Sequence, residues 1–250
     1  MPPDSLDGVF TDPPYFANVQ YAELMDFCYA WLRLGLGAEF PPFRSTTTRT
    51  HAELTGNETM GRGLNHFTEG LSQVFCHYAS ALKKGAPFVF TYHHNDPEAY
   101  VPLVVAILDA GLDCGATLPV PAEMGASLHI ARSSSSVLDS VFVCRKRTAG
   151  IGDTDVEEWV RRDFDALTAA GLNISEGDIR CLTSGHVARM AINKLRATWD
   201  RALPLGRRML KAHEHLILLA REVNVSRVMT QLFAKTQSAG KSGKARAAAL

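Results

Sequence analysis

The chain has 250 residues, 46% of them hydrophobic, which is enough for one domain with an appendage or for two small domains. No apolar run reaches the length of a transmembrane helix, and the first residues lack the pattern of a signal peptide, so we expect a cytoplasmic protein. Five cysteines are scattered without a Cys-x-x-Cys pair or a histidine at metal-ligand spacing. This pattern favours buried, reduced thiols and no metal site.

The formal net charge is zero, but the charges are unevenly distributed along the chain. Residues 1–179 hold 12 Lys and Arg against 23 Asp and Glu, whereas residues 180–250 hold 14 against 3. A protein that neutralises phosphates releases condensed counterions, so a basic C-terminal region is typical of nucleic-acid contact. The alternative is a basic helical face that pairs with the acidic part of the same chain.

The first predicted element is a strand at residues 6–11, an apolar and β-prone run. Asp12-Pro13-Pro14-Tyr15 follows it, and two consecutive prolines cannot continue a ladder of hydrogen bonds. We therefore expect Asp12 and Tyr15 to lie beyond the carboxyl end of the strand, where open α/β sheets bind their ligands. The alternative is an ordinary exit from a strand, because Asp and Pro are common turn residues.

The chemistry of this tetrapeptide suits a planar base with an exocyclic amine. The Asp12 carboxylate and the Pro13 carbonyl can accept two hydrogen bonds from the amine and turn its nitrogen lone pair toward an electrophile. Tyr15 offers a face on which a base can stack, worth about 1–3 kcal/mol per base. An enzyme that modifies a base of a duplex must first take that base out of the stack.

Helical periodicity or β-prone composition predicts the elements that follow, in chain order. They are helices at about 21–32, 65–83, 96–111, 153–171, 185–203 and 206–235, and strands at 87–92, 113–120 and 139–145. The apolar side of the first helix is expected to pack in the core (Tyr21, Leu24, Met25, Cys28, Trp31 and Leu32). Residues 36–64 are expected to form a surface loop beside the catalytic cleft. No long helix is evident between the last two strands, which suits an antiparallel final strand.

Asp12-Pro13-Pro14-Tyr15 resembles the catalytic signature of the amino-group DNA methyltransferases, which transfer a methyl group from S-adenosylmethionine to adenine N6 or cytosine N4. Residues 16–32 resemble a narrower group, the adenine-specific methylases that carry a domain of unknown function. Further similarity lies at residues 89–94 and 133–147. The resemblance covers roughly residues 6–147 and the remainder only loosely.

The resemblance implies roles for individual residues. Asp12, Pro13, Pro14 and Tyr15 would be catalytic, Tyr15 and Phe16 would contact the base, and Thr11 and Asp12 would face the cofactor. It also implies an α/β fold, in which residues 1–148 form the catalytic half of a Rossmann-like methyltransferase sheet. A mostly helical, basic region at residues 149–235 and a disordered basic tail at 236–250 would follow.

A cofactor-binding half is missing from the predicted pattern. Such enzymes need a Gly-rich turn after their first strand and an acidic residue after the second, and in this family both precede the tetrapeptide. Only eleven residues stand there, and neither Gly61 and Gly63 nor Gly240 and Gly243 follow a strand. Three explanations stay open: a split enzyme whose partner chain supplies the cofactor half, a truncated gene, or an inactive fragment. Each leaves an exposed sheet edge beside residues 6–11, which invites pairing with another chain.

The leading hypothesis is therefore S-adenosylmethionine-dependent methylation of adenine N6 in DNA, by a fragment or split part of a larger enzyme. No strong general base is required, because alignment of the amine with the methyl donor supplies most of what the displacement needs. One alternative is a non-catalytic DNA-binding or interaction remnant of such an enzyme. Another is a methyltransferase that acts on cytosine N4 or on an RNA base.

Overall fold

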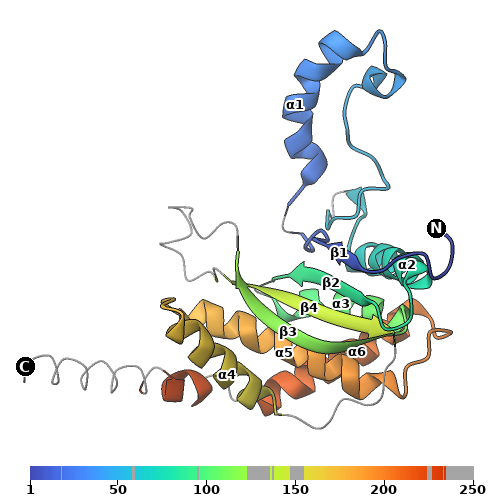
Figure 1. Ribbon diagram of the computed structural model, residues 1–250. Coiled ribbons are helices and arrows are strands. Elements are labelled where there is room, and N and C mark those ends of the chain that lie inside the picture. Colours follow the sequence, from blue (N-terminus) through green and yellow to red (C-terminus); the bar gives the residue numbers. More distant parts are fainter. Residues whose placement is uncertain are drawn as a thin grey trace, which may run out of the picture.

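A four-stranded mixed sheet lies at the centre of the protein (Figure 1). The computed structural model describes residues 1–17, 19–57, 60–94, 96–122, 136, 138–146, 155–223, 227–232 and 234. The strands are β1 (Val9–Thr11), β2 (Pro87–Tyr92), β3 (Leu112–Pro121) and β4 (Leu138–Lys146). Their order is β1-β2-β4-β3, with β1 parallel to β2 and β4 antiparallel to both of its neighbours. The chain is therefore an α/β protein, and the antiparallel strand predicted near residue 139 is confirmed.

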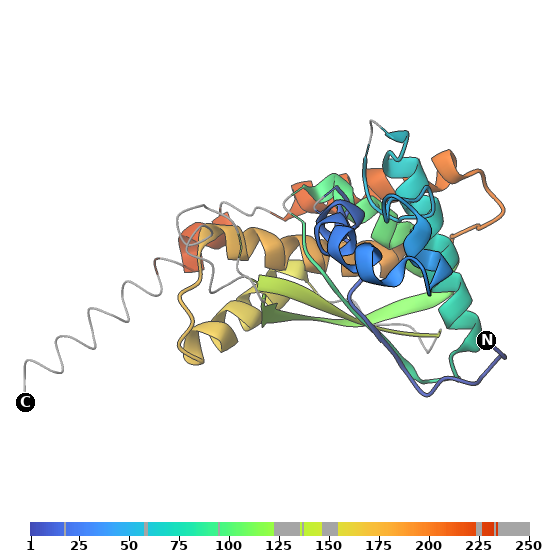
Figure 2. The same ribbon diagram turned by 90° about the horizontal axis from the view of Figure 1, so that it is seen from above.

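The helices lie mainly on one face of this sheet (Figure 2). They are α1 (Tyr21–Leu36), α2 (Leu64–Ala81), α3 (Tyr100–Asp109), α4 (Val156–Ala169), α5 (Glu176–Arg196) and α6 (Leu205–Glu222), with the short 3₁₀ helices η1 (Pro41–Arg44) and η3 (Pro97–Ala99). α2, α3, α5 and α6 lie on the covered face, whereas the opposite face carries no helix in the described part of the chain. We call this second side the open face.

Side-chain alternation in β2 explains why one face is covered. Phe88, Phe90 and Tyr92 are buried, and the residues between them are only half-buried. Phe75 of α2 lies 4.9 Å from Phe88 and 5.2 Å from Phe90 between ring centroids, and Phe142 of β4 stacks on Phe90 at 5.1 Å. Burial of each large apolar side chain contributes about 1.5–3 kcal/mol, so these rings fix the sheet against α2.

The C-terminal helices belong to the same core as the sheet. Every residue of α3 is buried, as expected for a helix that is apolar on all sides and lies between other layers. Arg196 at the end of α5 pairs with Asp113 at 2.9 Å and donates to the Leu108 carbonyl at 2.8 Å. Trp199 donates to Asp109 at 2.9 Å, and Arg208 of α6 pairs with the same carboxylate. Residues from both predicted regions, 1–148 and 149–235, thus share one hydrophobic cluster.

α5 begins at Glu176, about nine residues before the predicted start. Ser175 and Asp178 form a capping box, in which each side chain accepts a hydrogen bond from the backbone of the other. Gly185 permits the close approach of α5 to the sheet, because a Cβ there would lie 2.6 Å from the Ser140 hydroxyl. Gly185, which weakens the helical pattern in the sequence, therefore serves the packing of α5 on the sheet.

The other predicted elements agree with the structure except at their ends. β2 has the predicted bounds, and α2, α3, β3, β4, α4 and α6 lie within or close to their predicted ranges. The first strand is shorter than predicted, although Leu6 forms an isolated bridge with Leu82. The predicted disordered tail, residues 236–250, lies outside the described residues.

The predicted packing of the first helix is wrong. The helix forms, but Tyr21, Leu24, Met25, Trp31 and Leu32 are exposed, and Cys28 is exposed as well. The reason is that α1 belongs to an arm, residues 19–57, that extends away from the sheet (Figure 1). The loop predicted at 36–64 forms the return of this arm and contains η1.

The arm is anchored at its base by polar contacts. Gln20 Nε2 donates to the Gly56 carbonyl at 2.6 Å, and the Thr55 hydroxyl donates to the Val19 carbonyl at 3.0 Å. Arg62 is buried and pairs with Glu53 at 2.9 Å. The base of the arm is therefore well connected, whereas its helix leaves the body of the protein.

Candidate functional site

The Asp12 carboxylate lies at the carboxyl end of β1, beside the end of β2. Asp12 is exposed, and its Oδ1 accepts hydrogen bonds from the Thr91 hydroxyl and, at 3.3 Å, from the Tyr15 hydroxyl. Because both donors bind the same oxygen, Oδ2 has no hydrogen-bond partner among the described residues. The carboxylate is thus held in one orientation and presents a free acceptor.

Tyr15 stands next to this carboxylate and is half-buried. Its ring lies 5.1 Å from the ring of Tyr92, tilted by 57°, so part of its surface is covered by β2. Burial raises the pKa of Tyr15 well above its ordinary value. The phenol therefore stays protonated near neutral pH and acts as a donor to Asp12.

The two prolines and the neighbouring aromatic residue set the exit of the chain from the sheet. Pro13 is buried and Pro14 is half-buried, which is consistent with a rigid turn at this point. Phe16 packs against Phe67 of α2 in an edge-on contact at 5.4 Å, and a Cβ at Gly56 would lie 2.7 Å from the Phe16 ring. Phe16 is thus fixed between α2 and the base of the arm, and its contact with a base stays a prediction.

β2 contributes residues that sequence reasoning did not assign to the site. Thr91 is the residue that fixes Asp12, and the only sequence signal for it is a hydroxyl at the end of a strand that adjoins the first one. His93 follows, with Nδ1 3.1 Å from the Cys181 sulfur on α5. Burial lowers the pKa of His93, and the neighbouring His94 lowers it further. Burial raises the pKa of Cys181 to about 12, so the thiol beside His93 stays protonated near pH 7.

The described residues do not form a cradle for S-adenosylmethionine. β1 is followed by Asp12 and two prolines, and β2 is followed by two histidines, so no Gly-rich turn leads from either strand into a helix. The glycines with positive φ in the described part, Gly61, Gly85, Gly111 and Gly171, do not follow strands. Thr11, which the resemblance places near the cofactor, is exposed at the end of the edge strand. The described residues thus contain the Asp12 site but no Gly-rich turn that could hold the cofactor implied by the resemblance.

Much of the basic charge of the C-terminal region pairs within the chain. Arg196 and Arg208 pair with carboxylates of the sheet domain, Asp113 and Asp109, and Arg227 pairs with Glu157 at 2.7 Å. Arg189 lies 3.8 Å from the centroid of the Trp159 ring. For part of the basic region, these contacts favour the alternative that its charges pair with the acidic part of the same chain. Other basic side chains there are exposed, namely Lys194, Arg201, Arg207 and Arg221.

Comparisons of the chain with models of known protein families, with curated proteins and with solved structures found no match. Among the helices in the described residues, none is both long enough and apolar enough to cross a membrane.

Proposed function

We propose that this chain is the base-binding, catalytic part of an S-adenosylmethionine-dependent methyltransferase that acts on adenine N6 in DNA. The observation that carries the proposal is the Asp12 carboxylate at the carboxyl edge of the sheet. Thr91 and Tyr15 hold one of its oxygens, and the other is available to an amine. The Asp-Pro-Pro-Tyr motif supplies the chemical class.

The residues of the site have distinct tasks in this proposal. Asp12 Oδ2 and the Pro13 carbonyl accept hydrogen bonds from the two hydrogens of an exocyclic amine and orient its nitrogen lone pair. Tyr15 contacts the base and donates to Asp12, and its raised pKa keeps it neutral as a donor. Because the nitrogen of an aminopurine needs orientation more than deprotonation, no strong base beside Asp12 is required.

The methyl donor would be S-adenosylmethionine, a sulfonium compound that supplies an activated methyl group. The described residues lack a cradle for it, so we derive no step through the cofactor. The proposal for this chain is confined to capture and orientation of the target base. DNA is the proposed partner, which the exposed basic side chains Lys194, Arg201, Arg207 and Arg221 support.

Recognition of the amine can be tested with the chain alone. A labelled duplex with one adenine opposite an abasic position offers a base that leaves the stack at low cost. We expect tighter binding than to the same duplex with purine, which lacks the amine, by about tenfold, as for a hydrogen bond to a charged group. Asp12→Ala should remove this preference, whereas Leu210→Ala, an exposed apolar position on α6, should keep it. Equal binding of adenine and purine by the wild-type chain would contradict the proposal.

Methyl transfer itself requires a cofactor-binding half in the same reaction. Transfer of labelled methyl groups to DNA, with the corresponding half of an adenine methylase added, should depend on Asp12. Equal label with wild type and Asp12→Ala would overturn the catalytic assignment. Substrates that offer only cytosine, or RNA in place of DNA, distinguish the cytosine N4 and RNA-base alternatives, and preferential labelling of either would replace adenine N6.

The second candidate is a non-catalytic DNA-binding remnant, which the basic C-terminal region favours. In that case DNA binding would weaken with salt and would survive Asp12→Ala, without preference for adenine over purine. Reversal of the charges at Arg201 and Arg207 would abolish it. The same anisotropy measurements therefore separate the two functions.

A further inference from the structure

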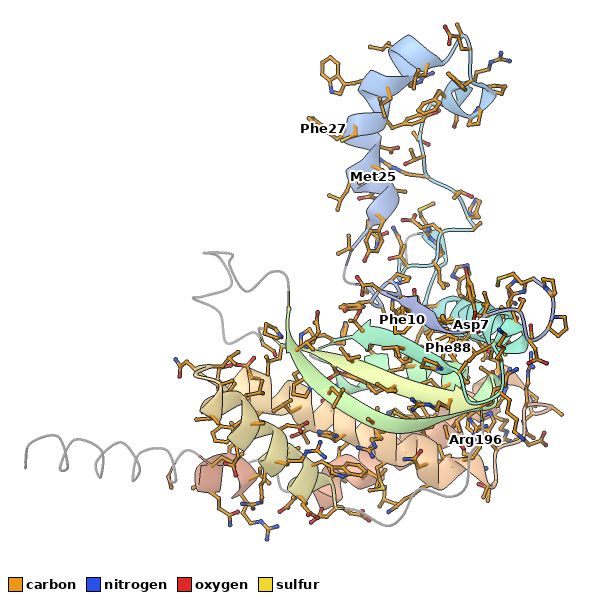
Figure 3. The ribbon with its side chains drawn as sticks, in the orientation of Figure 1. Asp7, Phe10, Met25, Phe27, Phe88 and Arg196 are labelled. Carbon is orange, nitrogen blue, oxygen red and sulfur yellow. The ribbon has the colours of Figure 1, made fainter. Side chains whose placement is uncertain are left out.

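Two buried thiols face each other across β3 and β4. Cys114 and Cys144 are direct partners in the antiparallel register, and neither is exposed to solvent. Phe88 of β2, labelled in Figure 3, continues the same row of the sheet, so both thiols point to the covered face. Partners in an antiparallel ladder lie about 4.5–5.5 Å apart between Cα atoms, and a disulfide spans about 4.4–6.8 Å. The two cysteines are free in the structure, but their register suits a cross-strand disulfide.

Hydrogen bonds make the two sulfurs chemically different. The Cys144 thiol donates to the Cys114 sulfur, and the Thr117 hydroxyl lies 3.9 Å from the same atom. When it is protonated, Cys114 itself donates to the Ala116 carbonyl at 3.4 Å. Burial alone would raise the pKa of Cys114, but its hydrogen bonds lower it below the ordinary value. Burial raises the pKa of Cys144, and Cys114 raises it further, so Cys114 ionises first and Cys144 keeps its proton.

A buried guanidinium lies close to these thiols. Arg189 of α5 is only 8% exposed, and its guanidinium carbon lies 3.8 Å from the centroid of the Trp159 ring. Its Nε has no hydrogen-bond partner in the described part of the chain. A buried charge is costly unless an opposite charge compensates it. The position of Arg189 therefore favours an anion nearby.

Cys114 is the group that best supplies this anion. Burial lowers the pKa of Arg189, and Cys114 opposes this effect more than Asp163 does. The Asp163 carboxylate is already engaged, because it lies 2.8 Å from His186 and 2.7 Å from Arg162. The charge of Arg189 adds to the hydrogen bonds that lower the pKa of Cys114. Because the thiolate is the nucleophile, Cys114 has the environment of a reactive cysteine, with a second thiol beside it.

We infer that hydrogen peroxide converts Cys114 and Cys144 into a reversible cross-strand disulfide. The Cys114 thiolate attacks one peroxide oxygen, the O–O bond breaks, and the leaving hydroxide takes up a proton to become water. The Cys144 sulfur then attacks the sulfur of the Cys114 sulfenic acid. The S–O bond breaks, and the oxygen leaves as water with the proton of the Cys144 thiol. The two thiols thus lose two electrons and two hydrogens, and the peroxide is reduced to two waters.

The surroundings of the pair determine which oxidant acts and how easily the bond is reduced. Both thiols are closed to solvent, which excludes a bulky oxidant such as glutathione disulfide and leaves a molecule little larger than water. The bulge after Cys114 interrupts the ladder there, so the strand can adjust as the bond closes. Oxidation removes the thiolate that compensates Arg189. Because the reduced state is stabilised in this way, the disulfide is readily reduced.

The test uses the full chain with Cys28→Ser and Cys76→Ser, which removes the exposed and the half-buried cysteine. Hydrogen peroxide should lower the intact mass by two hydrogens, and peptide mapping should join the peptides of Cys114 and Cys144. Dithiothreitol should restore the mass. Glutathione disulfide should modify the chain in urea but not the folded protein. A folded chain that peroxide leaves unchanged, or a disulfide to Cys181 instead, would overturn the inference.

Serine variants of the pair separate the two roles. Cys144→Ser should stop the reaction at the sulfenic acid of Cys114, which dimedone traps. Cys114→Ser should leave Cys144 reduced under the same conditions. Oxidation of Cys144 at an undiminished rate in Cys114→Ser would contradict the assignment of Cys114 as the attacking thiolate.

Variants of Arg189 test its part as a positioning residue. Arg189→Gln should slow disulfide formation by about tenfold or more, because less of Cys114 is then ionised. Arg189→Lys keeps the positive charge and should restore most of the rate. Arg180→Gln, at an arginine of α5 that is 58% exposed, should leave the rate unchanged, and urea midpoints check that each variant folds. Equal slowing by Arg189→Gln and Arg189→Lys in folded proteins would indicate packing and contradict the role of the charge.

Discussion

α1 and α3 have similar apolar content along much of their length, yet their environments are opposite. Every residue of α3 is buried between the sheet and the other helices, whereas only Ala22 of α1 is buried. The difference follows from position, because α3 lies on the covered face and α1 on the arm beyond β1. An apolar periodicity predicts that a helix has a face to bury, but not which molecule buries it. The protein thus has a packed side and an open side.

The largest expected contrast is between matched truncations on the two helices. Ile107→Ala removes a fully buried side chain of α3 and should lower the free energy of unfolding by about 2–5 kcal/mol. Leu34→Ala on α1 should change it by less than about 0.5 kcal/mol, because the side chain is exposed in the isolated chain. Urea denaturation measures both values. A comparable loss for Leu34→Ala would show that α1 is buried in solution and would break the comparison.

Breaking an ion pair should also lower the free energy of unfolding more on the packed side than on the arm. Arg196 pairs with Asp113 and also donates to backbone carbonyls at the end of α3, at 2.8 Å for Leu108. Its truncation to Ala leaves these acceptors without a donor and should cost about 2–4 kcal/mol. Arg49 pairs with Asp26 on the arm, but its side chain is 49% exposed, so Arg49→Ala should cost about 0–1 kcal/mol. Equal losses of unfolding free energy for the two variants, measured by urea denaturation, would contradict the packing of the C-terminal helices against the sheet.

The sequence predicted most elements of the packed side, because their signals are local. β2 alternates buried and half-buried residues, and Asp96 with Pro97 marks the start of the segment that becomes η3 and α3. Ser175 and Asp178 also carried a local signal for the start of α5, but Gly177 and Gly185 obscured the helical pattern. The exposure of the apolar side of α1 could not be predicted from the sequence, since burial depends on which segments lie nearby.

The candidate site was predictable in part, because some of its residues are neighbours in the sequence. Asp12 and Tyr15 are adjacent in sequence and lie at a strand exit that two prolines enforce, so their proximity followed from the motif. Thr91 is 79 residues from Asp12 and reaches it only because β1 and β2 pair in parallel. A short sequence motif does not specify the pairing register of two strands that are far apart in the chain.

Thr91 offers a smaller test that concerns function rather than stability, because its hydroxyl lies at the edge of the open side. Thr91→Val keeps the shape of the side chain but removes the donor to Asp12. The ratio of the affinities for the adenine and purine duplexes should fall by about three- to tenfold. This change corresponds to the loss of one hydrogen bond, about 0.5–1.5 kcal/mol. Thr91→Ser keeps a hydroxyl and should restore the preference. Loss in both variants, measured by anisotropy, would indicate a packing role for Thr91 instead of positioning of Asp12.

The smallest expected contrast is the pH dependence of stability on the packed side, which depends on one buried histidine. His186 Nε2 lies 2.8 Å from the Asp163 carboxylate, and Nδ1 has no partner among the described residues. Burial lowers the pKa of His186, and the opposing attraction of Asp163 does not reverse this, so the folded protein holds a neutral imidazole. Although burial alone would raise the pKa of Asp163, hydrogen bonds from His186 and Arg162 lower it, so the carboxylate stays charged.

The unfolded chain takes up a proton on His186 at higher pH than the folded protein does. The stability that neutral His186 contributes is therefore complete above about pH 6.5 and is lost as the pH falls through the lower pKa of the folded state. Urea midpoints measured from pH 7.5 down to pH 5 should decrease for the wild-type chain, and His186→Gln should flatten this decrease. Leu218→Gln, at an exposed apolar position on α6, changes no titratable group and should leave the slope unchanged. A slope that survives His186→Gln would place the titrating group elsewhere, with His93 as the next candidate, because burial lowers its pKa.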